Sequence, residues 1–245
     1  MLEEATRMQT VIFDVDDTLY DQTLPFKKAI QKYFNQSFTD KELTELYLAS
    51  RKYSDSLFFK STTGEVSIEE LQTYRITEAC REFGITLSYQ EALDFQDAYL
   101  AEQHKITLFE EVEELLNNLY QQNIQLAVLT NGEKDHQSMK IKQLGLKKWM
   151  PEEYFFISGA LGHAKPAQEV FTIIENKLQL DKTNTIYIGD SFEHDVVGAK
   201  KAGWQSIWMN HRNRQAPTTP VKPDKVVYNA KELLEVFRND YSLMS

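Results

Sequence analysis

Hydrophobic and polar positions follow two patterns along this chain. Short apolar runs rich in β-branched and aromatic residues predict buried strands. They lie at residues 10–15, 124–130, 154–158, 185–190 and 205–209, with a weaker one at 225–228. Between them, apolar residues recur with helical spacing, and Val112, Leu115, Leu116 and Leu119 are one such stripe. Strands that alternate with helices predict an α/β fold, a parallel sheet with helices on both faces.

Residues 20–105 break this alternation. We find no convincing strand there, and Ile76, Ala79, Cys80 and Phe83 form an apolar stripe of the kind that packs a helical bundle. Capping-box pairs, which mark helix starts, occur at Thr39–Glu42, Ser67–Glu70 and Ser88–Glu91. We therefore predict an inserted helical domain over residues 20–105 and a core made of residues 1–19 and 106–245.

Composition narrows the classes of function. The chain has 245 residues, of which 42% are hydrophobic, and this ordinary balance can fill a real core. A net charge of −10 without a basic stripe argues against a nucleic-acid polymer as partner. We expect no membrane helix and no signal peptide, because neither pattern occurs. The single cysteine, Cys80, excludes an intrachain disulfide and suits a cytoplasmic protein.

Acidic residues follow two of the predicted strands. Asp14 and Asp16 end the first, while Asp190 ends the fourth and Asp195 comes one helical turn later. Ligands gather at the carboxyl ends of parallel strands, so these carboxylates are expected to converge there. Their mutual repulsion would be relieved by a hard divalent cation, and Mg²⁺ fits best because it accepts few carboxylates together with a substrate phosphate.

The spacing of Asp14 and Asp16 suggests their chemistry. Residues two apart in an extended segment point the same way, so the two carboxylates could flank one reacting atom. One would attack phosphorus and the other would donate a proton to the leaving oxygen.

A countercharge and phosphate donors come from two other segments. Pro166 favours the first position of a helix, which would place the Lys165 ammonium just before a helix N-terminus. There it would neutralise the nucleophile and a transferring phosphoryl group. The Thr130 hydroxyl and the backbone amides of Asn131 and Gly132 would bind phosphate oxygens.

Taken together, four segments resemble the motifs of the haloacid dehalogenase-like hydrolase superfamily in their usual order. They are DVDDT from residue 14, LTNG from 129, HAKP from 163 and GDSFEHD from 189. The resemblance implies a Rossmann-like core. It also implies that Asp14 is the nucleophile that becomes aspartyl-phosphate, and that Asp16 is the general acid and base.

The same resemblance assigns roles to the remaining motif residues. Thr130 and Lys165 would hold the phosphate. Asp190 would bind Mg²⁺ together with Asp14 and the backbone carbonyl of Asp16. Asp195 would orient Lys165 or a metal-bound water, and Ser191 would lie beside the ligands without binding the ion.

The insertion resembles the family's helical cap, which closes over the site and contributes specificity. Candidate substrate contacts there are Arg51, Lys52, Tyr53, Phe58 and Lys60, although each fits an ordinary helix surface equally well. His163 and His194 adjoin motif residues without zinc-type spacing, and we expect them to face solvent or to support the site indirectly.

These residues predict a Mg²⁺-dependent phosphatase acting on a small phosphorylated metabolite. A phosphomutase uses a similar core and stays open as an alternative. Dehalogenation of a 2-haloacid needs no acid for the leaving group, so Asp16 argues against it. A receiver-type signalling domain is much shorter and lacks an insertion.

The substrate is less defined. LTNG and the segment WMNHRNRQAP from residue 208 look like the nucleoside 5′-monophosphate phosphatase branch. Phosphoglycolate, sugar phosphates and flavin mononucleotide compete with a pyrimidine-like nucleotide. The sequence leaves the substrate and the oligomeric state open.

Overall fold

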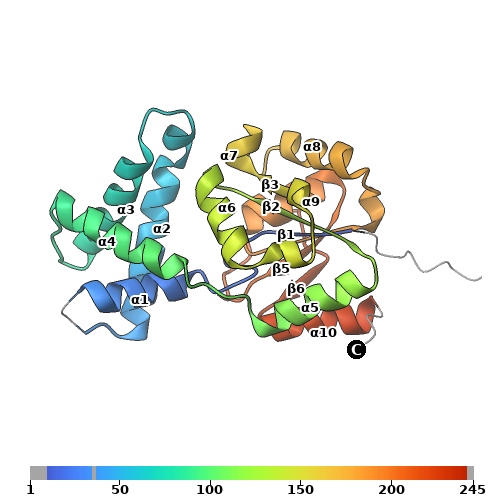
Figure 1. The fold of residues 1–245 in the computed structure, drawn as a ribbon, viewed down its shortest axis with the longest axis horizontal. Coiled ribbons are helices and arrows are strands. Elements are labelled where there is room, and N and C mark those ends of the chain that lie inside the picture. The colour runs from blue at the N-terminus through green and yellow to red at the C-terminus, as the bar shows by residue number, and fades with distance from the viewer. Residues whose placement is uncertain (1–9, 35–36, 242–245) are drawn as a thin grey trace, which may run out of the picture. The chain divides into compact units, whose positions relative to one another are not determined.

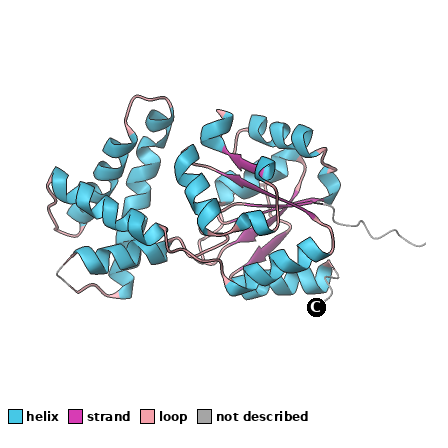
Figure 2. Ribbon diagram, viewed as in Figure 1, coloured by secondary structure: helices cyan, strands magenta, loops and turns pink. Residues whose placement is uncertain are grey.

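The computed structural model describes residues 10–34 and 37–241 of the chain. It divides into two compact units: one runs up to Asp21 and resumes at Thr107, and the other is Gln22–Ile106. These boundaries lie within two residues of those predicted from the sequence. Helices dominate the second unit, whereas strands and helices alternate in the first (Figure 2).

The first unit is built on a six-stranded parallel sheet in the order β3-β2-β1-β4-β5-β6 (Figure 1). The strands are β1 (Thr10–Phe13), β2 (Gln125–Thr130), β3 (Phe155–Ile157), β4 (Thr185–Gly189), β5 (Gln205–Met209) and β6 (Lys225–Val227). Each corresponds to a predicted strand, and the α/β fold class is confirmed. The strand order reverses around β1, which lies between β2 and β4. In open α/β sheets such a switch point is where ligands bind.

Helices cover both faces of this sheet (Figure 1). They are α5 (Glu110–Gln121), α6 (Lys134–Gln143), α7 (Ser158–Leu161), α8 (Gln168–Leu178), α9 (Val197–Ala202) and α10 (Ala230–Asp240). Short 3₁₀ helices are η1 (Leu146–Lys148), η2 (Glu152–Tyr154) and η3 (Lys182–Asn184), and η4 (Phe192–Val196) is a π-helix.

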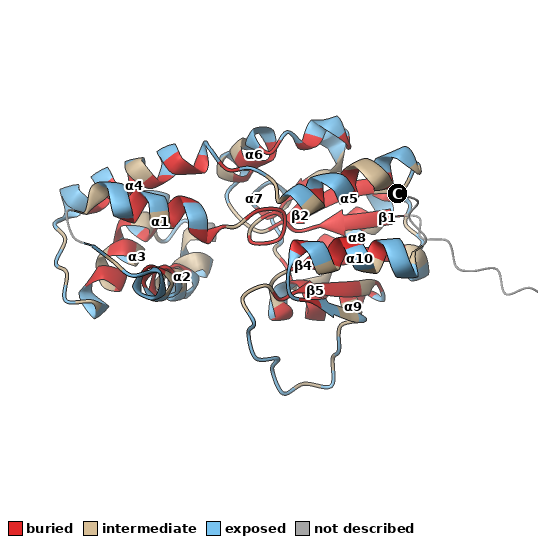
Figure 3. Cartoon of the chain, turned by 90° about the horizontal axis from the view of Figure 1, so that it is seen from below, coloured by how far each residue is buried: buried red, intermediate tan, exposed pale blue. Residues whose placement is uncertain are grey.

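The core forms where helical stripes meet the sheet. The predicted stripe of α5 is fully buried, and α8 packs Val170, Phe171 and Ile174 against Ile12 and Tyr187 of the sheet. Burial of each large apolar side chain contributes about 1.5–3 kcal/mol. Figure 3 shows this burial along the sheet and the inner sides of its helices. The sheet is therefore a rigid base for the groups at its strand ends.

The segment between β5 and β6 contains no helix or strand over residues 210–224, which include three of the six prolines of the chain. Its beginning nevertheless contributes charged side chains to the site described below. No helix in the described part of the chain is both long and apolar enough to cross a bilayer.

The second unit is a helical bundle of α1 (Thr23–Tyr33), α2 (Asp40–Thr62), α3 (Ile68–Glu82) and α4 (Tyr89–Gln103). The three predicted capping boxes are all formed, with Thr39, Ser67 and Ser88 as N-caps. At the centre, the ring of Phe26 makes edge-on contacts with those of Tyr47, Phe95 and Tyr99 at centroid distances of 5.5, 5.6 and 5.5 Å. Such pairs contribute beyond simple burial.

Cys80 belongs to the same bundle core and is 0% exposed. Burial raises the pKa of its thiol to about 12, so the thiol remains neutral at physiological pH. It acts as a small apolar residue there.

Candidate active site

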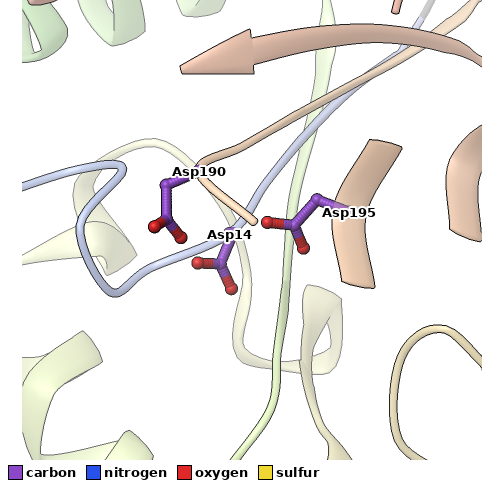
Figure 4. Close-up of side chains that lie close together, drawn as sticks. All are labelled: Asp14, Asp190 and Asp195. Carbon is purple, nitrogen blue, oxygen red and sulfur yellow. The ribbon is translucent and has the colours of Figure 1, made fainter. Parts of the chain in front are cut away.

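Three aspartates meet at the carboxyl ends of β1 and β4. Asp14 follows β1 and donates its backbone N–H to the carbonyl of Ile188 at 2.8 Å, which extends the pairing with β4 by one residue. Asp190 follows β4, and Asp195 lies in η4. One carboxylate oxygen from each of Asp14, Asp190 and Asp195 lies within 4.8 Å of the others (Figure 4). The convergence expected from the sequence is therefore present for these three residues.

A buried ammonium group neutralises part of this cluster. The Nζ of Lys165 lies 2.7 Å from Oδ1 of Asp14, 2.7 Å from Oδ1 of Asp195 and 2.8 Å from the Tyr187 hydroxyl. Burial alone would lower the pKa of Lys165, but attraction to the two carboxylates outweighs it and raises the pKa. Lys165 is therefore charged, with a partner for each of its three N–H donors.

The sequence predicts that Lys165 lies directly before a helix N-terminus, and this prediction is wrong. Residues 164–167 form a turn in which Ala167 N–H donates to the carbonyl of Ala164 at 2.9 Å. The N-cap of α8 is Ala167 and the helix begins at Gln168, so Pro166 lies in the turn and not at the first helical position. The ion pairs, and not a helix N-terminus, define the surroundings of the ammonium.

The Asn131 side chain forms hydrogen bonds with both backbone groups of Lys165. Its Oδ1 accepts from the Lys165 N–H and its Nδ2 donates to the Lys165 carbonyl, both at 2.9 Å. The predicted contact of the Asn131 backbone amide with phosphate stays a prediction. The Gly132 amide donates to the Ser158 hydroxyl at 2.9 Å, so it has a protein partner where a phosphate oxygen was expected.

Thr130 lies where a phosphate-binding hydroxyl was expected. It ends β2, beside β1, and is 1% exposed. Its Oγ1 is buried and has no hydrogen-bond partner among the described residues. A buried hydroxyl without a partner is costly, so a ligand oxygen at this atom would stabilise the site.

Tyr187 is a site residue that sequence reasoning missed. Its hydroxyl donates to the carbonyl of Leu129 at 2.9 Å while accepting from Lys165. Burial raises its pKa well above the usual value, so the phenol stays neutral. The available signal was a tyrosine inside a strand of otherwise apolar residues, because a buried phenol needs a polar partner.

Charge repulsion at the site fits a bound cation. Burial raises the pKa of Asp14 to about 7, with Lys165 opposing the shift and Asp195 adding to it. Burial and the charge of Asp17 raise the pKa of Asp190 well above its usual value. A divalent ion would favour the ionised form of both carboxylates.

The three clustered aspartates differ in how many of their carboxylate oxygens already have hydrogen-bond partners. Asp195 uses Oδ1 on Lys165 and accepts the Ser191 N–H with Oδ2 at 2.8 Å. In the part of the chain that the structure describes, Oδ2 of Asp14 and Oδ1 of Asp190 have no hydrogen-bond partner. These two oxygens could bind a cation such as Mg²⁺, which accepts one or two carboxylates, whereas both oxygens of Asp195 are already bound to protein groups.

Asp16 has different surroundings from the three clustered aspartates. Its two oxygens lie 2.7 and 2.8 Å from Nζ of Lys140, and they also accept from Gln137 at 2.9 Å and Tyr20 at 2.5 Å. Burial would raise its pKa, but Lys140 outweighs that effect and lowers the pKa to about 2. The sequence predicts that Asp14 and Asp16 point the same way from one extended segment. That segment ends earlier than expected, because β1 stops at Phe13 and the chain takes a positive φ of 57° at Asp17.

The loop after β5 brings basic side chains to Asp17 and its neighbours. Arg212 binds Asp17 through Nε at 3.0 Å and Nη2 at 2.6 Å, and it also contacts Asp21 at 2.5 Å. His211 Nε2 lies 3.2 Å from Asp17, while Arg214 contacts Asp190 at 2.9 Å. In the sequence, this loop is notable only because it resembles a segment of nucleoside 5′-monophosphate phosphatases. In the structure, its basic side chains neutralise the acidic turn after β1.

Candidate substrate residues of the helical unit have partners within that unit. Arg51 pairs with Asp55 at 3.3 Å, while Lys52 and Tyr53 both contact Glu82, at 2.9 and 2.7 Å. Phe58 is half-buried and Lys60 is exposed. His163 and His194, in the core unit, are exposed as expected.

The parallel sheet forms a Rossmann-like core with a carboxylate–lysine site at its strand ends. The chain belongs to the haloacid dehalogenase-like hydrolases, whose family model matches residues 11–209. It is 25% identical over 216 residues to the pyrimidine 5′-nucleotidase YjjG of Escherichia coli, covering 84% of this chain and 88% of that protein.

Two solved structures share the fold. The Bacillus subtilis HAD-hydrolase YfnB, solved with magnesium bound, has a TM-score of 0.70 and 24% identity, covering 94% of this chain and 98% of that one. The L-2-haloacid dehalogenase of Xanthobacter autotrophicus has a TM-score of 0.71 and 16% identity, covering 95% and 99%. The fold is thus shared by proteins whose names imply different reactions.

Proposed function

We propose that this hydrolase is a Mg²⁺-dependent phosphatase that forms an aspartyl-phosphate on Asp14. The observation that carries the proposal is the cluster of Asp14, Asp190 and Asp195 with Lys165 bound between two of them. In our proposal this cluster supplies a nucleophilic oxygen, a carboxylate pair for a cation and a fixed positive charge at one strand edge. The buried Thr130 hydroxyl adds a donor for a phosphate oxygen.

Asp14 begins the reaction. A carboxylate oxygen of Asp14 attacks phosphorus, and the contact of Lys165 with Oδ1 keeps the carboxylate oriented. The bond from phosphorus to the ester oxygen breaks, and Asp16 donates a proton to that oxygen. Lys165, bound to Asp14 and Asp195, keeps its positive charge beside the phosphoryl group, and the Thr130 hydroxyl donates to a phosphoryl oxygen as charge redistributes.

Asp16 also completes the turnover. It takes a proton from a water molecule that attacks phosphorus, and cleavage of the acyl-phosphate bond restores Asp14. A pKa of about 2 makes Asp16 anionic in the resting site, the form that this second step needs. For the first step, the negative charge of a bound phosphoryl group would raise that pKa.

Mg²⁺ would be held by Asp14, Asp190 and the backbone carbonyl of Asp16. When bound, it supplies positive charge that offsets repulsion between Asp14 and the phosphoryl group. In our proposal the Gln22–Ile106 unit serves as the cap, which excludes bulk water and selects the substrate.

For the substrate, we favour a nucleoside 5′-monophosphate with a pyrimidine base. The name of the YjjG relative and the segment that begins at Trp208 support this choice. Phosphoglycolate, sugar phosphates and flavin mononucleotide are the competing substrates. A phosphomutase would move the phosphoryl group to a second hydroxyl and release no phosphate.

The decisive experiment is a screen of phosphorylated metabolites with Mg²⁺, with released inorganic phosphate as the readout. We expect phosphate release that EDTA abolishes and added Mg²⁺ restores. 2-Chloropropionate, assayed for chloride without metal, serves as the comparison. Chloride release without phosphate release would contradict the proposal, and a preference for sugar phosphates alone would reject the nucleotide assignment.

A further inference from the structure

Lys140 is a lysine buried inside the core unit. It lies in α6 and its side chain is 2% exposed, whereas its neighbour Lys142 on the same helix is exposed. A buried ammonium group is costly unless a charged partner is available. Asp16, which lies 124 positions earlier in the chain, provides that partner.

The contact determines how the Asp16 carboxylate is oriented. Lys140 Nζ binds both oxygens, at 2.7 and 2.8 Å, so that rotation of the carboxylate would break a contact. Gln137 lies one turn earlier on the same side of α6 and donates its Nε2 to Oδ2 of Asp16 at 2.9 Å. The same Nε2 lies 3.1 Å from the carbonyl of Asn131, which links Asp16 to the loop after β2.

We propose that Lys140, assisted by Gln137, is a positioning residue that holds Asp16 in place for proton transfer to the leaving oxygen. This inference rests on the proposed phosphatase function. In our mechanism Lys140 does not contact the substrate and acts through Asp16. The competing role is purely structural, in which Lys140 only neutralises a buried carboxylate.

Leaving-group chemistry separates the two roles. An alkyl alcohol leaves as a strongly basic oxygen and needs a proton from Asp16, whereas nitrophenolate leaves without one. General acid catalysis contributes about 10²–10⁴-fold where it is needed. The value of kcat/KM covers only the steps up to formation of the aspartyl-phosphate, and so excludes the later hydrolysis in which Asp16 acts as a base for both esters. A misplaced Asp16 would therefore lower kcat/KM selectively for alkyl phosphates, while a damaged fold would lower it for both substrates alike.

The test compares Lys140→Met with Lys140→Arg and with Lys142→Met, a matched lysine on the exposed side of α6. Each variant is assayed with Mg²⁺ on 4-nitrophenyl phosphate and on the alkyl phosphomonoester that the wild type cleaves fastest. We expect Lys140→Met to lower kcat/KM for the alkyl ester about 100-fold, with less than a tenfold fall in kcat/KM for the aryl ester. Lys140→Arg should recover part of the loss, and Lys142→Met should match the wild type.

Equal falls on both esters, or no fall on the alkyl ester, would overturn the positioning role while leaving the phosphatase assignment intact. A wild type that releases phosphate from neither ester would instead overturn the function itself, and this inference with it. If Lys140→Met does not fold, Gln137→Leu keeps the question open to measurement. That variant removes one donor to Asp16 and should show the same selectivity for alkyl esters at smaller magnitude.

Discussion

The ammonium of Lys165 lies 2.7 Å from a carboxylate oxygen of Asp14, although 151 positions separate the two residues in the chain. β1 and β2 are neighbours in the sheet, and Asn131, just after β2, binds the backbone of Lys165. The pair therefore depends on the parallel sheet and on one amide side chain. Its consequences for activity and stability are measurable.

Asp14→Asn should lower kcat on 4-nitrophenyl phosphate at least about 1,000-fold, because an amide oxygen is a poor nucleophile toward phosphorus. Steady-state assays with Mg²⁺ measure the effect. Asp97→Asn, at an exposed position of the helical unit, is the control and should retain full activity. Substantial turnover by Asp14→Asn would place the nucleophile elsewhere.

Lys165→Met should destabilise the protein by about 3 kcal/mol, because it leaves Asp14 and Asp195 buried without their shared cation. Urea unfolding without metal at pH 7.5 gives the free energy of unfolding. Adding Asp195→Asn to this variant should recover part of the loss. Lys182→Met, which removes a half-exposed surface lysine, should change little. An unchanged urea midpoint for Lys165→Met would contradict the proposed energetics of the buried triad.

The metal-free protein should become less stable as pH rises from about 4 to about 7. Burial raises the pKa of Asp14 from its ordinary value of 3.8 to about 7 in the folded chain. Between those values the folded state binds more protons than the unfolded state, so the free energy of unfolding falls with increasing pH. Above pH 7, Asp14 should cause no further decrease in the free energy of unfolding.

Urea titrations in EDTA at several pH values test this dependence. Asp14→Asn removes the titrating group, so its decline over the same range should be smaller than that of the wild type. Parallel pH profiles for the two proteins would show that Asp14 does not titrate as described.

Asn131→Ala should lower kcat/KM about tenfold while the protein stays folded, because Lys165 loses both hydrogen bonds to its backbone. Asn131→Asp is the informative partner variant. It keeps an acceptor for the Lys165 N–H but loses the donor to the Lys165 carbonyl, so we expect an intermediate activity. A wild-type value of kcat/KM for Asn131→Ala would show that the turn at Lys165 keeps its conformation without these two hydrogen bonds.

Local patterns predicted the elements of this fold well. The capping boxes at Ser67 and Ser88 formed as expected, since each involves residues three positions apart. Periodicity predicted β1 and β4, and their parallel order then placed Asp14 and Asp190 at one edge. The start of α8 was wrong by two residues, because the hydrogen-bonded turn at Ala164 delays the helix.

The sequence by itself determined the α/β core, the helical insertion and the motif residues, because periodicity and short spacings encode local structure. The tertiary structure alone decided which side chains from distant segments became partners. Lys140 reads as one more polar residue of α6, and Tyr187 as one more strand residue, until the fold buries them. A buried ammonium group needs a charged partner, and a buried phenol needs a hydrogen bond. Asp16 is that partner for Lys140, and Lys165 is that partner for Tyr187.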